Sequence, residues 1–159
     1  MGKAMFGVAA LALAGVFGMA RADEEKLALD KVPAPVMQAV KDRFPRGEAV
    51  AASKETENGQ TLFEVEIKRQ GVTIDVTATA DGKIVGIETT IAAEDFPRAV
   101  AEAIKAKHPA GKIKKSEEVV KVRDGKEVLE YFEAEVEADG KTYELKFQGD
   151  GKPVGEEKK

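Results

Sequence analysis

The chain has 159 residues, of which 43% are hydrophobic and 34% are charged, a composition that fits one ordinary soluble domain or two very small ones. It contains no cysteine, which excludes disulfides and thiolate chemistry. The formal net charge is −4 and no basic stripe is present, which argues against a nucleic-acid partner.

The N-terminal segment has the layout of a secretory signal peptide. Lys3 gives a positive start, an uncharged run rich in Ala, Leu, Val and Gly covers 4–20, and Ala-Arg-Ala at 20–22 offers small residues for a signal peptidase. The alternative is a membrane anchor, but a spanning helix needs about 20 apolar residues, and this run is shorter and is broken by Gly15 and Gly18. We therefore predict a periplasmic or secreted protein without stable membrane insertion after cleavage.

The remaining chain is predicted to contain one unit written twice. Residues 23–31 are polar and predict a flexible leader, 32–91 and 92–155 form the two units, and 156–159 form a charged tail. Each unit is expected to bury one face of a small sheet under one helix.

Each unit begins with a short predicted helix bounded by prolines. Pro33 and Pro35 suit a first helical turn, and an apolar stripe at helical spacing follows before Pro45. The same set returns at one constant offset in the second unit, as Pro97, Val100, Ile104, His108, Pro109 and Gly111. Chance does not readily give both prolines, the glycine and the stripe together.

Up to four antiparallel strands are predicted after each helix. The clearest are 62–67 and 131–136, which alternate apolar and acidic residues at period two, as a strand with one buried and one wet face does. A last strand near Pro153 is expected to be short, frayed or absent, because proline cannot donate to a ladder. The predicted fold class is α+β, with two tandem helix-plus-antiparallel-sheet repeats packed as one continuous sheet.

The Pro-bounded helices, Phe-Glu-Val-Glu at 63–66 and Asp-Gly-Lys at 81–83 and 150–152 resemble the PepSY-like family, in particular its β-lactamase-inhibitor-like group. The resemblance implies an exported bacterial protein with a fold similar to β-lactamase inhibitory protein, whose sheet presents a concave face to an enzyme. That inhibitor's repeats are disulfide-linked, whereas this chain has no cysteine. No binding residue is carried over from it.

The chemistry-bearing residues predict a protein that is not an enzyme. The only serines are Ser53 and Ser116, and the only imidazole is His108, on the helix stripe where a packing or capping role is expected. No nucleophile–base pair is indicated. No DxDxDG loop is present, so no metal site and no cofactor are predicted.

The candidate binding surface is the outward face of the two acidic strands. Its predicted members are Leu62, Glu64, Glu66, Tyr131, Glu133 and Glu135. Outward Leu and Tyr in a charged face indicate a contact surface, so the predicted function is binding of another exported protein, in the specific form of inhibition of a secreted or periplasmic hydrolase. The alternatives are a small-ligand or calcium-binding module that uses the same carboxylates, and a simple solvated face. The sequence does not fix the oligomeric state.

We expect the exported product to begin at Asp23, because Ala-Arg-Ala at 20–22 ends the apolar run. Intact-mass measurement of the periplasmic or secreted protein checks this. A mass that still includes residues 1–22 would contradict it.

Overall fold

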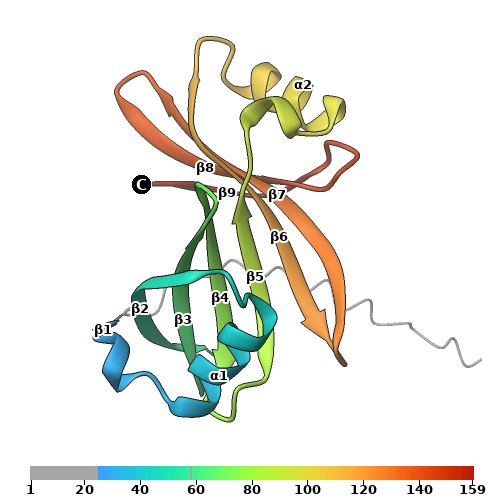
Figure 1. Ribbon diagram of the computed structural model, residues 1–159. Helices are drawn as coiled ribbons and strands as arrows, with labels where there is room; N and C mark the ends of the chain where they lie inside the picture. Colours follow the sequence, from blue (N-terminus) through green and yellow to red (C-terminus); the bar gives the residue numbers. More distant parts are fainter. Residues whose placement is uncertain (1–24, 58) are drawn as a thin grey trace, which may run out of the picture.

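The computed structural model describes residues 25–57 and 59–159, and its framework is one antiparallel sheet of nine strands (Figure 1). The strands lie in the sheet in chain order, and each pairs with the next. The prediction of one continuous antiparallel sheet is therefore confirmed. The predicted signal peptide at 1–22 lies outside the described residues.

The sheet is accompanied by two α-helices and two short 3-10 turns. The strands are β1 (Glu25–Leu27), β2 (Glu48–Glu57), β3 (Gln60–Arg69), β4 (Val72–Thr79), β5 (Ile84–Thr90), β6 (Lys112–Arg123), β7 (Lys126–Ala138), β8 (Lys141–Phe147) and β9 (Pro153–Lys158). The helices are α1 (Ala34–Arg43) and α2 (Arg98–Lys107), and the turns are η1 (Leu29–Lys31) and η2 (Ala93–Asp95). Within the described part of the chain, neither helix has the length and apolarity needed to cross a membrane.

Each helix is bounded as its sequence predicts. Pro33 and Pro97 precede the first turns, where a missing N–H leaves no bond unmade. At the opposite ends, the N–H groups of Phe44 and His108 donate to carbonyl oxygens four residues earlier, at 2.8 and 2.9 Å. The His108 ring lies 4.4 Å from the ring of Tyr143, so the packing role predicted for this histidine is confirmed.

Both helices cover the same face of the sheet. The core under α1 joins Val36 and Val40 of the helix to strand residues that include Val65, Val76 and Ile87. The core under α2 joins Val100 and Ile104 of the helix to strand residues that include Phe132, Val136 and Leu145. Ile87 pairs with Val120, and Glu118, two residues earlier on β6, pairs with Phe132. Since side chains two apart on a strand share a face, the two cores lie on one side.

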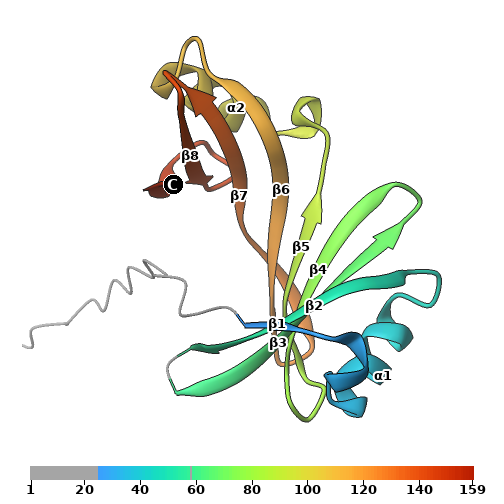
Figure 2. The same cartoon turned by 90° about the vertical axis from the view of Figure 1, so that its left-hand side faces the viewer.

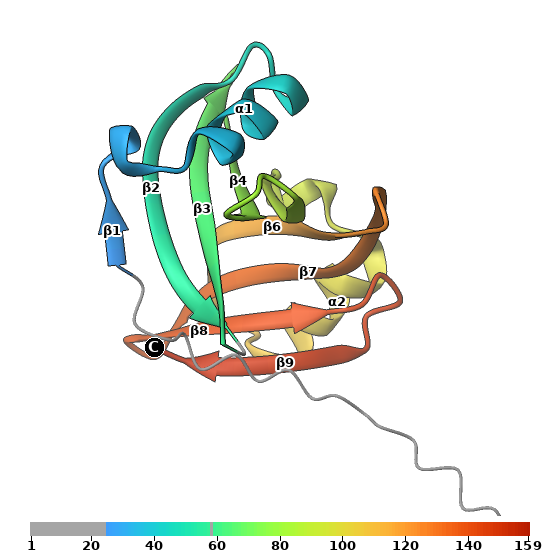
Figure 3. The same ribbon diagram turned by 90° about the horizontal axis from the view of Figure 1, so that it is seen from below.

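The strands turn strongly along the sheet, so β2 and β3 run across the direction of β7 and β8 (Figures 2 and 3). We call the side opposite α1 and α2 the helix-free face.

The long hairpin of β6 and β7 ties the second half of the chain to the first. Val120 and Val122 pack against the core under α1. Beyond them, Arg43 of α1 donates twice to Glu127 of β7, at 3.0 and 2.6 Å. This hairpin is longer than its counterpart formed by β2 and β3, and its far end makes a contact between the two halves.

The prediction of a flexible leader at 23–31 is wrong for the part that the structure describes, because that part forms β1 and η1. Leu27 and Leu29 pack against the core under α1, and Lys54 pairs with Glu25 at 2.9 Å. Two leucines in a polar stretch are enough to place a strand on the otherwise open edge of β2.

The prediction that the last strand frays or is missing is also wrong. β9 pairs with β8 along its length, and it takes in most of the predicted charged tail at 156–159. Pro153 lies at the first position of an edge strand, beside a register shift, where its missing N–H breaks no ladder bond. Lys159 continues the pairing, since its N–H donates to the carbonyl of Thr142 at 3.0 Å.

We expect Phe132→Ala to lower the free energy of unfolding by about 3–5 kcal/mol, because Phe132 is 6% exposed and meets Phe96 edge to face at 6.0 Å. Phe63→Ala should cost less, since Phe63 is only partly buried. The exposed Glu137 is the control, and Glu137→Ala should stay within about 0.5 kcal/mol. Urea melts measure all three. Equal losses for Phe132→Ala and Glu137→Ala would contradict the assignment of the faces.

Candidate docking face of the sheet

All six predicted binding residues lie on the helix-free face. Leu62, Glu64 and Glu66 come from β3, and their positions pair with Thr79, Thr77 and Asp75 of β4. Tyr131, Glu133 and Glu135 come from β7 and pair with Val119, Glu117 and Lys115 of β6. Strands β4, β5 and β6 therefore separate the two groups. The structure places the six on one face but not in one cluster, and their binding role stays a prediction.

Parts of this face are drier than the alternation pattern predicts. Leu62 is 7% exposed and Val119 is 4% exposed, although neither contributes to the cores under the helices. Tyr131 is half-buried, with the ammonium of Lys146 at 5.4 Å from its ring centre. The expectation that Leu62 and Tyr131 project into solvent is therefore wrong, because neighbouring side chains of the turned sheet cover them.

One cross-strand row runs through the middle of the face. Glu66 pairs with Asp75, and Asp75 pairs with Glu88. Beyond them, Glu88 pairs with Val119, which pairs with Tyr131. Three carboxyl groups thus stand directly side by side, an arrangement that like-charge repulsion disfavours.

The second half of the face balances its carboxylates with lysines. The ammonium of Lys115 forms an ion pair with a carboxylate oxygen of Glu117 at 2.8 Å, although Glu117 is only 2% exposed. The ammonium of Lys146 forms ion pairs with carboxylate oxygens of Glu144 at 2.9 Å and of Glu133 at 3.4 Å. Buried carboxylates are tolerated when they are paired in this way.

At the centre of the face the balance is weaker, because the charge of Lys115 acts on Asp75 and Glu88 while its ion pair is with Glu117. Glu66 has Lys68 at 2.8 Å, but none of the ion pairs among residues 25–57 and 59–159 includes Asp75 or Glu88. Burial, with a smaller contribution from the nearby carboxylates Glu133 and Glu117, raises the pKa of Glu88 to about 8. Burial likewise raises the pKa of Asp75 to about 6. Near neutral pH, Glu88 therefore holds a proton for much of the time.

Elsewhere on the face, lysines shift a carboxyl group the other way. Burial works against ionisation of Glu144, but hydrogen bonds from Lys159 and Lys146 outweigh it and lower its pKa. The contrast with Glu88 follows from the presence or absence of an ammonium partner.

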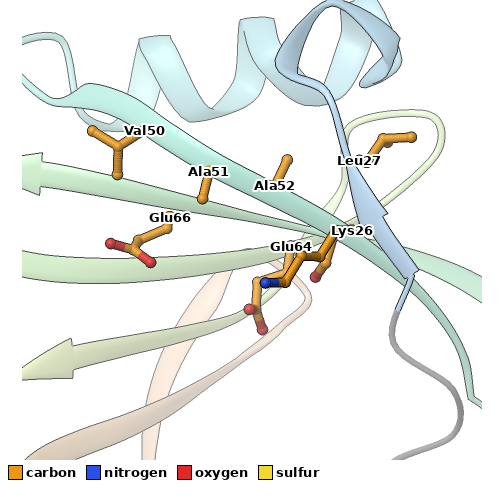
Figure 4. A pocket seen from close by; sticks show the side chains of 8 residues that line it. Lys26, Leu27, Val50, Ala51, Ala52, Glu64 and Glu66 are labelled. Carbon is orange, nitrogen blue, oxygen red and sulfur yellow. The ribbon is translucent and has the colours of Figure 1, made fainter.

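A hollow of about 430 Å³ opens at the edge of the face beside β1 (Figure 4). Its lining includes Lys26 of β1, Ala51 and Ser53 of β2, and Glu64 and Glu66 of β3. The small side chains of β2 leave this space between the charged groups of its neighbours.

The residues considered for catalysis and for metal binding have other roles or are spread apart. The Ser116 hydroxyl donates to the carbonyl of Ile91 at 2.7 Å. Within the described residues, no group of three or more His, Asp or Glu side chains is placed to hold a metal ion.

No protein-family model and no curated protein sequence matches this chain. Solved structures do share its fold. A protein described as periplasmic from Bacteroides eggerthii aligns with a TM-score of 0.65 at 17% identity, covering 80% of this chain and 88% of that one. A DUF2874 family protein from Bacteroides uniformis aligns with a TM-score of 0.63 at 17% identity, covering 79% and 88%.

A BLIP-like protein from Bacteroides fragilis also aligns, with a TM-score of 0.57 at 18% identity, covering 78% of this chain and 84% of that one. At these identities the likeness establishes the fold alone. This chain therefore has the fold of the BLIP-like and DUF2874 proteins.

We expect Glu88→Gln to stabilise the protein in alkaline solution. A carboxyl group whose folded pKa is about 8 binds a proton in the folded chain that the unfolded chain has already released. The stability that protonated Glu88 contributes is present at low pH. It is lost as the pH rises from the ordinary pKa of a glutamate to the folded pKa of about 8. The advantage of Glu88→Gln should grow across that range to about 1–2 kcal/mol, allowing for solvent screening.

Urea melts of both proteins at several pH values measure this difference. Glu137→Gln, at an exposed position of β7, should show no such growth. A stability difference for Glu88→Gln that is constant from acid to alkaline pH would contradict the assignment.

Proposed function

We propose that this chain is an exported, non-enzymatic module that binds another protein through the helix-free face of its sheet. The observation that carries the proposal is the centre of that face, where Val119 is 4% exposed and Tyr131 is half-buried, on the side of the sheet opposite α1 and α2. Such a centre within a polar surround resembles the anatomy of a protein interface.

The rigidity of the face supports the same proposal. Its side chains stand on strands held by ladder hydrogen bonds on both sides, so a partner would order little backbone on binding. Both halves of the chain contribute to this one surface, whereas α1 and α2 each cover only their own core. The acidic side chains favour a basic partner and a salt-sensitive association.

The export proposal has two supports. The N-terminal pattern at 1–22 is that of a secretory signal, and the aligned protein from Bacteroides eggerthii is described as periplasmic. We place this chain in the periplasm or outside the cell.

We also propose that the two halves are copies of one helix-plus-sheet unit. A side chain at Gly82 would strike the carbonyl of Pro35 at 2.5 Å, and one at Gly151 would strike the carbonyl of Ala99 at 2.6 Å. Both glycines have positive φ, and both turns press against the corresponding helix. The same close approach at matched positions supports a duplicated unit.

The specific form of the proposal is inhibition of a secreted or periplasmic hydrolase. Its support is the resemblance to the β-lactamase-inhibitor-like group, together with the BLIP-like protein among the aligned structures. A second candidate, binding of a small cationic ligand, is favoured by the hollow at the edge of the face, where Glu64 and Glu66 lie near small side chains.

The test uses residues 23–159 as bait in an extract of periplasmic proteins, followed by affinity measurement with the purified partner. We expect Tyr131→Ala and the Glu133→Lys/Glu135→Lys double variant each to weaken binding by about 2 kcal/mol or more. Glu102→Lys, at an exposed position of α2, is the matched control and should bind as the parent does.

Circular dichroism and urea melts establish that each variant is folded. Unchanged affinity in both face variants, or equal loss with Glu102→Lys, would move the contact away from the helix-free face.

A further inference from the structure

The outer edge of β7 is open over its first residues, 126–131. Strand β8 pairs with β7 only from Phe132 to Ala138. The stretch 126–131 lies along β6 on one side, and within the described residues no strand pairs with it on the other. This end of the β6–β7 hairpin extends away from β8 and β9 (Figure 1). An open edge of this kind presents backbone N–H and C=O groups to which another strand can bond.

The open stretch also carries two exposed aliphatic side chains. Val128 is 53% exposed and Leu129 is 46% exposed. Leu129 pairs with Val120, which packs against the core under α1, so Leu129 lies on the helix-covered side. Val128 follows the opposite direction and lies on the helix-free face. A strand laid along this edge would therefore meet an apolar side chain on each face of the sheet.

The other edges of the sheet are protected against added strands, by the devices that proteins ordinarily use. β9 begins at Pro153 and is otherwise rich in charged residues. β1 has 3 residues, and the part of β2 beyond it has a register shift between Ala49 and Ala51. In β7 the shift falls at Glu130, between Leu129 and Tyr131, so the pairing at 126–129 stays regular.

The open stretch is complementary to a second copy of itself. If two copies run antiparallel with Val128 opposite Val128, Lys126 of each copy stands opposite Glu130 of the other. Opposite charges at directly facing positions stabilise a strand pair. In its own chain Glu130 has Lys121 at 3.2 Å, so Lys126 of the second copy would add to an ion pair that already exists.

We propose that two copies of this chain associate through the 126–131 edge of β7, with Val128 on the two-fold axis. Such a contact uses the same surface on both copies and closes as a dimer. Facing side chains of an antiparallel pair point to the same side of the sheet, so the helix-free faces of the two copies would continue into each other. This inference goes beyond the docking function and does not depend on it.

The first test is sedimentation velocity of residues 23–159 over a range of protein concentrations. We expect a reversible dimer with a dissociation constant of about 10–100 μM, because the paired edge is shorter than a standard interface. Val128→Lys should raise that constant about tenfold or more, since two ammonium groups would then face each other. Val154→Lys, at a valine of β9 that is 46% exposed, is the matched control and should leave it unchanged.

The second test reads the register, and it is clean because the chain has no cysteine. Directly opposite Cα atoms of an antiparallel pair lie about 4.5–5.5 Å apart, a spacing that a disulfide can bridge. Under mild oxidation Val128→Cys should therefore form a covalent dimer, whereas Val154→Cys should not. Lys126→Cys mixed with Glu130→Cys should form a mixed dimer, and neither variant alone should cross-link.

A chain that stays monomeric over the whole concentration range would overturn the inference, as would equal weakening by Val128→Lys and Val154→Lys. Cross-linking of Leu129→Cys at the rate of Val128→Cys would contradict the register. If the chain is monomeric but Val128→Lys weakens binding of the exported partner, the edge serves that partner and the self-association falls. Urea melts establish that each variant is folded.

Discussion

The structure depends on one register that continues through the middle of the sheet. At β5 and β6, the pairing of Ile87 with Val120 and of Glu118 with Phe132 holds the two cores on the same side. A one-residue slip there would turn the second half over and place its apolar residues on the opposite face. Because the register holds, both helices cover one side, and the whole of the other side is left as a single surface.

Much of the fold follows from the sequence, for physical reasons that the exceptions make clear. The period-two alternation at 62–67 and 131–136 predicts β3 and β7, and the prolines before each helix predict where α1 and α2 begin. β1 and β9 were not predictable in the same way. Both are edge strands with little alternation, and they exist because neighbours offer them pairing partners: β2 for β1, and β8 for β9.

The candidate site could be predicted only in part. Alternation places Glu64, Glu66 and Glu133 on one face, but it does not tell which strands lie between them. Register shifts beside Thr77 and beside Val119 decide which residues of β5 and β6 reach the centre. Glu88 therefore becomes visible only through the pairing of five strands, although an acidic residue inside an otherwise apolar strand is the signal that could have found it.

Carboxyl labelling tests most directly whether a partner docks on the helix-free face. Carbodiimide coupling followed by mass spectrometry compares the free chain with its complex, residue by residue. If the partner docks there, Glu64, Glu66 and Glu88 lose reactivity in the complex, while Asp42 of α1 and Glu102 of α2 label equally in both. Protection of the helix carboxyls with no change on the sheet would contradict it.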